Sequence, residues 1–213
     1  MIKLFKKIIK KTLFIFSVLH DFRIYHCFNV QKRVLLDSDY VLMEKCCMSL
    51  EDIDGLVYRI TDGTALGLYR EGGFIKHDDD VDVDILFNDS KHIKLIKYKF
   101  KELGFKIGRE VHYRGLIQQL AFYLNNGFIF DIIFWHKNDN LIYNYSEKNY
   151  ERIQDYKYFD TEKMIYFTLN NKKYPIPTPI EEWLEFRYGK DWRTPKIYKG
   201  DWKEECFDMK IMN

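Results

Sequence analysis

The sequence predicts an α+β fold in which helices pack on a mixed β-sheet, and three observations support this. The chain has 213 residues, 46% of them hydrophobic and 17% aromatic, so it can bury a sizeable core and is not expected to be disordered. Helical and β-branched segments alternate along its first half. The dipeptide Asn126-Gly127 stands between two apolar runs, which indicates a β-hairpin.

The individual elements follow from local patterns. A helix at residues 38–50 can be capped by Ser38 or Asp39. A β-branched strand at 56–61 then stops at Asp62-Gly63. Glycines close the next two helices, and a proline-rich stretch leads into the last one. These further elements are a helix at 64–70, a strand at 81–87, a helix at 91–103, the hairpin of 116–124 with 128–134, and a helix at 180–188. Residues 140–175 are expected to form strands and loops.

The first 23 residues have a character of their own. Lysines recur at helical spacing on one side and apolar residues on the other, so residues 1–23 are expected to form an amphipathic basic helix. This helix either lies on an anionic membrane surface or packs on its own domain. Its uncharged stretch, residues 12–19, is too short to span a membrane. The lysines are Lys3, Lys6, Lys7, Lys10 and Lys11. Residues 24–213 are expected to form one domain.

Charge and cysteine content exclude some functional classes. Thirty-four Lys and Arg against 32 Asp and Glu leave a net charge of +2, so no nucleic-acid partner is expected. The four cysteines include no C-x-x-C pair, which argues against a zinc site or disulfide framework and favours a reduced, cytoplasmic protein.

A run of aspartates carries the most chemical information. In the strand at 81–87, alternation places Asp80, Asp82 and Asp84 on one face and apolar side chains on the other. Like charges this close repel one another unless a cation neutralises them, and hard oxygen ligands favour Mg²⁺ or Mn²⁺. Asp84 either joins this site or only continues the alternation. A solvated acidic edge remains an alternative. An EF-hand loop does not fit, because its sixth position is Val83 instead of glycine.

A third carboxylate is expected from the hairpin. Asp131 is the only polar residue in the strand at 128–134, and a buried lone carboxylate must be ion-paired or bound to a metal. A metal site shared with Asp80 and Asp82 is the better interpretation, and a salt bridge to Lys or Arg is the alternative. Upstream, Gly63 and Thr64 lie at a strand-to-helix turn, where the helix N-terminus favours phosphate.

Together these motifs resemble the nucleotidyltransferase superfamily. Residues 63–82, from Gly63-Thr64 to Asp80-Val81-Asp82, look like the first signature of the LicD/fukutin family. Residues 177–195, which include Trp183, Tyr188-Gly189 and Asp191-Trp192-Arg193, are similar to its second signature. The resemblance covers roughly residues 35–200 and implies a polymerase-β-like fold.

The resemblance also implies roles for particular residues. By position, Asp80 and Asp82 are metal ligands and Asp131 is the third catalytic carboxylate. Gly63 and Thr64 sit where the donor phosphates are held. Arg70 is a phosphate or structural partner. As a separate hypothesis, Arg193 and Lys196 steady phosphate or acceptor charge, and Arg193 and His77 are placed on the donor side. His77 and Lys76 stand where the family usually has Pro-Trp. Because of this departure, the sequence does not assign the phosphorylated alcohol that is transferred, and phosphocholine in particular is not assigned.

The family resemblance implies transfer of a phosphorylated alcohol from a CDP-linked donor to a hydroxyl of a glycan or glycolipid. Phosphocholine, ribitol phosphate and glycerol phosphate are the cargo types considered, in the modification of cell-surface polysaccharides or glycoconjugates. The expected location is the cytoplasm, peripheral on the inner face of a membrane. Two alternatives remain: a nucleotidyltransferase that moves NMP from an NTP, and a catalytically silent glycan- or membrane-binding module.

Overall fold

A computed structural model of the chain describes residues 22–26, 31–147, 150–196 and 207–211. Residues 1–21, which carry the expected amphipathic helix, lie outside the described residues. In the part of the chain that is described, no helix combines the length and the hydropathy needed to cross a membrane.

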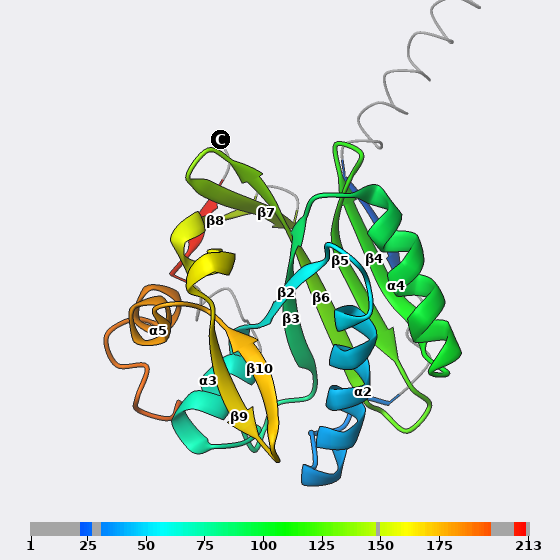
Figure 1. Cartoon of the computed structure of the whole chain (residues 1–213), viewed down its shortest axis with the longest axis horizontal. Helices are drawn as coiled ribbons and strands as arrows, with labels where there is room; N and C mark the ends of the chain where they lie inside the picture. The colour runs from blue at the N-terminus through cyan, green and yellow to red at the C-terminus, as the bar shows by residue number, and fades with distance from the viewer. Residues whose placement is uncertain (1–21, 27–30, 148–149, 197–206, 212–213) are drawn as a thin grey trace, which may run out of the picture.

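A nine-stranded mixed sheet forms the centre of the described structure (Figure 1). Its main path runs β1-β4-β5-β6-β7-β8-β11, while β3 pairs with β6 in parallel and β2 pairs with β3 in antiparallel. The strands are β1 (Phe22–His26), β2 (Val57–Ile60), β3 (Val81–Phe87), β4 (Lys106–Tyr113), β5 (Leu116–Tyr123), β6 (Ile129–Asn138), β7 (Leu141–Glu147), β8 (Tyr150–Asp155) and β11 (Met209–Ile211). A separate two-stranded sheet pairs β9 (Ile165–Leu169) with β10 (Lys172–Ile176).

The helices pack their apolar side chains into the core beside the sheet. The helices are α2 (Tyr40–Glu51), α3 (Asp62–Glu71), α4 (Ser90–Glu102) and α5 (Ile180–Tyr188), with short 3-10 turns at Asp37–Asp39, Tyr156–Phe159 and Thr161–Lys163. The α2 and α4 helices lie side by side near β4, β5 and β6 (Figure 1). Phe100 of α4 stacks on Phe122 of β5, with ring centroids 4.4 Å apart, and lies 5.3 Å from Phe130 of β6.

The side chains on the two faces of β6 pack into different core clusters. Phe130, Ile132 and Phe134 are buried in the main core, which also contains buried side chains of α2 and α4. The alternating positions, which begin at Asp131, point to the other face of the sheet. There Ile133 and Trp135 pack into a second core cluster with Ile142 and Phe159. The polar site described below therefore lies on the face of the sheet opposite α2 and α4.

Most of the expected elements are confirmed, two of them to the residue. The strand at 81–87 and the helix at 180–188 have the predicted bounds. The α4 helix ends next to Gly104, whose φ of +87° is one that a side chain would disfavour. Residues 140–175 do form strands and loops.

One expectation needs correction, and one strand was not expected. Phe22 and Arg23, assigned to the end of the N-terminal helix, lie instead in strand β1, which pairs antiparallel with β4. Strand β4 itself was not anticipated, because its sequence lacks a clean alternation. A register shift between Ile107 and Arg109 interrupts it.

Candidate active site

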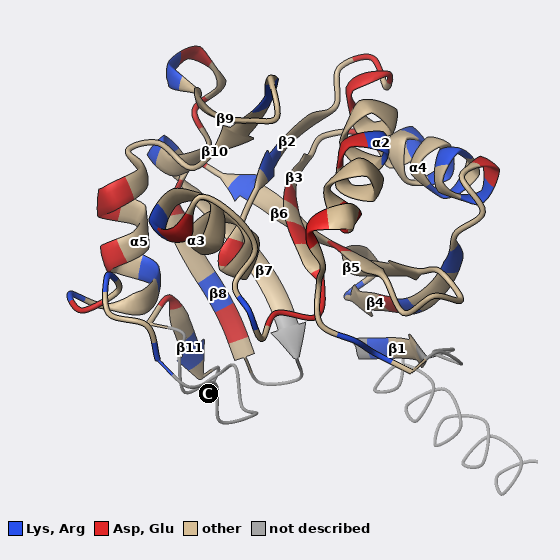
Figure 2. Ribbon diagram, turned by 90° about the horizontal axis from the view of Figure 1, so that it is seen from below, with Lys and Arg blue, Asp and Glu red and all other residues tan. Residues whose placement is uncertain are grey.

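Parallel pairing of β3 with β6 brings the predicted carboxylates together. Asp82 of β3 lies directly opposite Asp131 of β6, and Asp80 precedes the first residue of β3. Each of the three offers a carboxylate oxygen, and these oxygens lie within 4.8 Å of one another. Acidic residues gather in the loop that leads into β3 (Figure 2). Asp131 thus lies beside Asp80 and Asp82, as the sequence suggested.

The electrostatics of this cluster are unfavourable without a cation. Burial, and next the charge of Asp131, raise the pKa of Asp80 to about 7. Burial and then the charge of Asp80 raise the pKa of Asp82 well above its usual range. Burial also raises the pKa of Asp131, although Arg109 acts in the opposite direction. Three carboxyl groups that resist ionisation together are the arrangement that a divalent ion stabilises.

Asp131 uses its two oxygens differently. Oδ2 accepts a hydrogen bond from Nη2 of Arg109 at 2.7 Å and another from Nε2 of Gln119 at 2.6 Å. Oδ1 is buried and has no hydrogen-bond partner among the described residues. The salt bridge considered as an alternative therefore exists, but it occupies one oxygen and leaves the other free to act in the cluster.

The donor set fits a divalent cation. All the candidate ligands are carboxylate oxygens, which Mg²⁺ and Mn²⁺ prefer, and the buried Oδ1 of Asp131 lacks another partner. Asp80 also belongs to a second group of close carboxylates, with Asp78 and Asp79. Asp79 is ion-paired with Lys32, whose Nζ lies 3.2 Å from its Oδ2. Asp80, Asp82 and Asp131 are accordingly the better set for the ion.

Asp84 does not join this cluster. Its Oδ2 accepts hydrogen bonds from Nε and Nη2 of Arg59 at 2.9 and 2.8 Å, and both side chains are fully buried. The same guanidinium donates to the side chain of Gln154 and to the carbonyl of Tyr158. Asp84 is therefore the counter-ion of a buried arginine, and the option of Asp84 as a metal ligand is not realised.

The N-terminus of α3 lies against the aspartates. Thr64 is fully buried, and its Oγ1 accepts a hydrogen bond from the backbone N–H of Asp82 at 2.9 Å. A Cβ atom on Gly63 would lie 2.7 Å from Oδ2 of Asp78, so the absence of a side chain lets the acidic loop approach the helix. Gly63 and Thr64 thus link α3 to the carboxylate cluster.

Sequence reasoning missed a buried ionic network beneath this helix. Asp62 has a φ of +41°, an unusual conformation for a non-glycine residue. Arg152 of β8 donates to both of its oxygens at 2.9 and 3.0 Å, and Arg187 of α5 donates at 2.7 Å. Despite burial, these two arginines lower the pKa of Asp62. Arg152 also bonds Asp208 at 3.0 Å. No local sequence signal joins these residues.

Comparisons with known proteins now assign the family. Residues 55–179 match the family model described as the LicD/FKTN/FKRP nucleotidyltransferase domain. The chain belongs to the LicD/fukutin family. Its nucleotidyltransferase fold, expected from the sequence, is thereby confirmed together with the mixed sheet and its helices.

Individual relatives are distant. The ribitol-5-phosphate transferase FKTN of Mus musculus is 27% identical over 166 residues, which cover 76% of this chain and 34% of that protein. Its Homo sapiens counterpart is 25% identical over 153 residues, covering 70% and 32%. This LicD-family chain therefore spans about a third of the length of these relatives. An uncharacterized protein of Rickettsia typhi is 35% identical over 78 residues, covering 32% of this chain and 25% of that protein.

One solved structure with a similar arrangement is the lincosamide antibiotic adenylyltransferase LnuA. Its TM-score is 0.48 at 13% identity, and the match covers 71% of this chain and 86% of that chain.

The two LicD signatures meet in space. Arg70 of the first donates to the backbone carbonyl of Trp192 in the second at 3.0 Å, and it pairs with Glu71. Tyr69 bonds Glu181 at 3.1 Å and lies 5.9 Å from the ring of Trp192. Of the two roles considered for Arg70, these contacts favour that of a structural partner.

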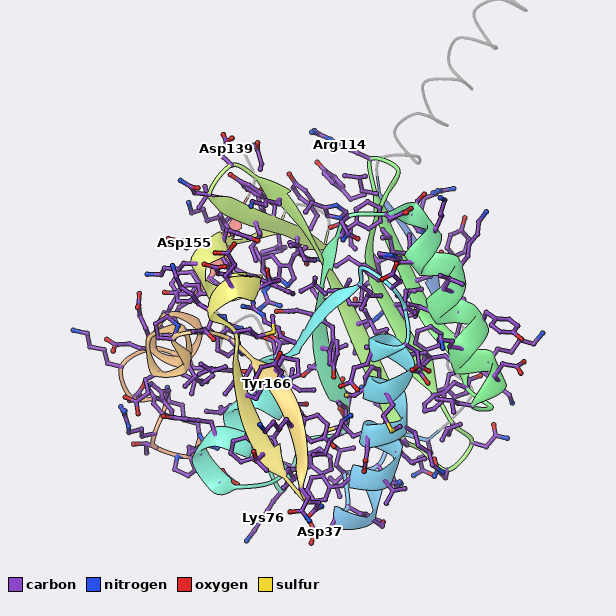
Figure 3. All side chains as sticks on the ribbon, in the orientation of Figure 1. Asp37, Lys76, Arg114, Asp139, Asp155 and Tyr166 are labelled. Carbon is purple, nitrogen blue, oxygen red and sulfur yellow. The ribbon has the colours of Figure 1, made fainter. Side chains whose placement is uncertain are left out.

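The remaining donor-side residues are on the surface. Arg193 is exposed, pairs with Glu181 at 2.8 Å and stacks over the ring of Trp192. Lys196 pairs with Asp191 at 2.9 Å. His77 is exposed in the loop before the aspartates, next to Lys76, which projects at the lower edge of the molecule (Figure 3). Arg193 and Lys196 thus contact residues of the second signature, between residues 177 and 195.

Proposed function

We propose that this LicD-family protein transfers a phosphorylated alcohol from a CDP-linked donor to a hydroxyl of a glycan or glycolipid, with Mg²⁺ or Mn²⁺ as cofactor. The observation that carries the proposal is the carboxylate cluster of Asp80, Asp82 and Asp131 beside the N-terminus of α3. The names of the fukutin relatives point to ribitol phosphate as one cargo of this class.

Asp80 and Asp82 would hold the ion, which when bound offsets negative charge on the attacking and leaving oxygens. The positive end of the α3 dipole, at Gly63 and Thr64, favours the donor diphosphate on the same side of the cluster. Chain residues thus supply position and charge for an in-line displacement, in which the acceptor oxygen attacks phosphorus and CMP leaves.

Oδ1 of Asp131 is available for one of two roles. It either completes the coordination of the ion or accepts the proton of the attacking hydroxyl. We expect Asp131→Asn to weaken Mn²⁺ binding by tenfold or more, on the order of 1.4 kcal/mol, if the oxygen is a ligand. A variant with wild-type Mn²⁺ affinity and lost turnover would assign the residue as the base.

The reaction is tested by its products. The purified protein is incubated with Mg²⁺ or Mn²⁺ and with CDP-ribitol, CDP-choline, CDP-glycerol or nucleoside triphosphates, in the presence of candidate acceptors. Metal-dependent release of CMP with one CDP-alcohol, absent in Asp82→Asn, is the expected result. Release of pyrophosphate from a triphosphate alone would instead establish NMP transfer. A protein that binds neither the cation nor any donor would be a silent module.

A location at the inner face of a membrane belongs to the same proposal. The lysine-rich sequence of residues 1–23 suits an anionic lipid surface, where a glycolipid acceptor would be presented. Modification of a cell-surface polysaccharide or glycoconjugate would then begin from the cytoplasmic side.

A further inference from the structure

We propose that Arg109, with Lys32 beside it, forms an oxyanion subsite that binds a phosphate group of the substrate. The proposal deepens the proposed function and rests on it. It assigns Arg109 a ligand that neither the family match nor the relatives' names identify.

Arg109 belongs to a row of residues that crosses the sheet. Arg109 of β4 lies opposite Ala121 of β5, which lies opposite Asp131 of β6, which lies opposite Asp82 of β3. Ala121 is fully buried and small, so the Arg109 side chain can cross over it to reach Asp131. On the far side of the row, the N–H of Thr61 bonds the carbonyl of Asp82. Arg109 and the N-terminus of α3 therefore flank the carboxylate cluster from opposite sides.

The guanidinium of Arg109 has unused hydrogen-bonding capacity. An arginine has five N–H donors. Within the described residues, the guanidinium of Arg109 makes one hydrogen bond, from Nη2 to Asp131, and its Nε is buried without an acceptor. Leaving a charged donor buried and unpaired costs free energy, and an oxyanion with several acceptor oxygens is the group that removes this cost. The side chain is 30% exposed, so a ligand can reach it.

The charge of Arg109 also suits an anion. Arg109 pairs with Asp131 and offsets its charge. Asp80, Asp82 and Asp131 would hold a divalent ion, whose charge would offset theirs and leave more of the guanidinium charge available to an anion. Lys32 adds a second cation near this site: its charge interacts with those of Asp80 and Arg109, it pairs with Asp79, and its side chain is 52% exposed. Arg109, Lys32 and such an ion would together supply the positive charge that a phosphate group of the substrate requires.

The test compares Arg109→Met with Arg114→Met in the full chain. Arg114 is an exposed arginine at the β4–β5 turn (Figure 3) and serves as the matched control. Calorimetry measures the affinity for Mn²⁺ alone, and then for pyrophosphate, CDP and glycerol 3-phosphate at fixed free Mg²⁺. We expect Arg109→Met to weaken binding of a phosphate ligand about tenfold or more while Mn²⁺ affinity stays the same or increases. Arg114→Met should change neither.

The probes distinguish the source of the phosphate. Weaker binding of pyrophosphate and CDP places the donor in the subsite, whereas weaker binding of glycerol 3-phosphate alone places a phosphorylated acceptor there. Unchanged binding of all three probes would overturn the proposal. So would a parallel loss of Mn²⁺ affinity, because Arg109 would then only position Asp131.

Two further readouts keep the result interpretable. The exposed Lys32→Met variant, expected to weaken the same probe severalfold, covers the case in which Arg109→Met does not fold. An unchanged affinity in Lys32→Met would remove Lys32 from the subsite. If Arg109→Met loses pyrophosphate binding but no CDP-alcohol yields CMP, the subsite stands and the proposed function fails.

Discussion

Two aspartates on the same face of β3 illustrate how position decides the role of a residue. Asp82 faces other carboxylates, whereas Asp84 is paired with buried Arg59. We expect Asp82→Asn to abolish turnover and leave stability unchanged or higher, because it removes like-charge repulsion. Asp84→Asn should lower the free energy of unfolding by about 3 kcal/mol or more, because it leaves Arg59 buried without its counter-ion. Urea denaturation of both variants checks this, and equal stabilities would contradict it.

The same cluster predicts an unusual pH dependence. A carboxyl group with a raised pKa keeps its proton in the folded state after the unfolded chain has lost it, so stability falls as pH rises through that window. For Asp80 the window runs from about 4, the usual carboxyl value, to about 7. Without metal, the melting temperature should fall across this range. The fall should be shallower in Asp82→Asn, and added Mg²⁺ should oppose it most at the upper end. If the melting temperature of the wild type depended on pH no more steeply than that of Asp82→Asn, the raised pKa values would be contradicted.

At single positions, the sequence could predict the cluster but not its neighbours. Alternation along a strand places Asp80 and Asp82 on one face, and a lone polar residue in an apolar strand marks Asp131. The role of Asp84 depends on its ion pair with Arg59, 25 residues away. The role of Asp62 depends on Arg152 and Arg187, 90 and 125 residues away. Such pairs are set by tertiary packing, for which no local rule exists.

Whole elements are tied together by the network around Asp62. Arg152 joins α3 to β8 and, through Asp208, to the segment before β11. We expect Arg152→Met to lower the free energy of unfolding by about 3 kcal/mol or more, because two buried carboxylates lose a partner. The exposed pair of Arg193 with Glu181 is the matched control, since Arg193→Met should cost less than about 1 kcal/mol. A similar loss in both variants would show that the network adds nothing to stability.

Arg193→Met also tests the donor-side role assigned from the sequence. If Arg193 binds the donor, the variant should raise the KM for the CDP-alcohol several-fold at nearly unchanged stability. An unchanged KM would leave its stacking on Trp192 and its pair with Glu181 as its role.

Elements with strong local signals were predictable, and elements formed mainly by sheet pairing were not. The α4 helix has a regular apolar spacing and a closing glycine, and the hairpin has Asn126-Gly127. Strand β1 exists because β4 offers an edge, and β4 is interrupted by shifts in register. An edge strand such as β1 and an irregular strand such as β4 carry little hydrophobic pattern of their own.

At the scale of the whole molecule, the N-terminal segment sets the last prediction. Five lysines and a set of apolar residues occupy opposite sides of a helical pattern within residues 1–16. Near an anionic bilayer each lysine contributes on the order of 1 kcal/mol, so several together give measurable binding that salt weakens.

We therefore expect the full chain to sediment with vesicles of anionic lipid and to remain in solution with neutral vesicles. Replacing Lys3, Lys6, Lys7 and Lys10 by Gln should abolish the difference, while Asp82→Asn should keep it. If the quadruple variant sediments like the wild type, the segment is not a membrane anchor, and packing on its own domain becomes the better interpretation.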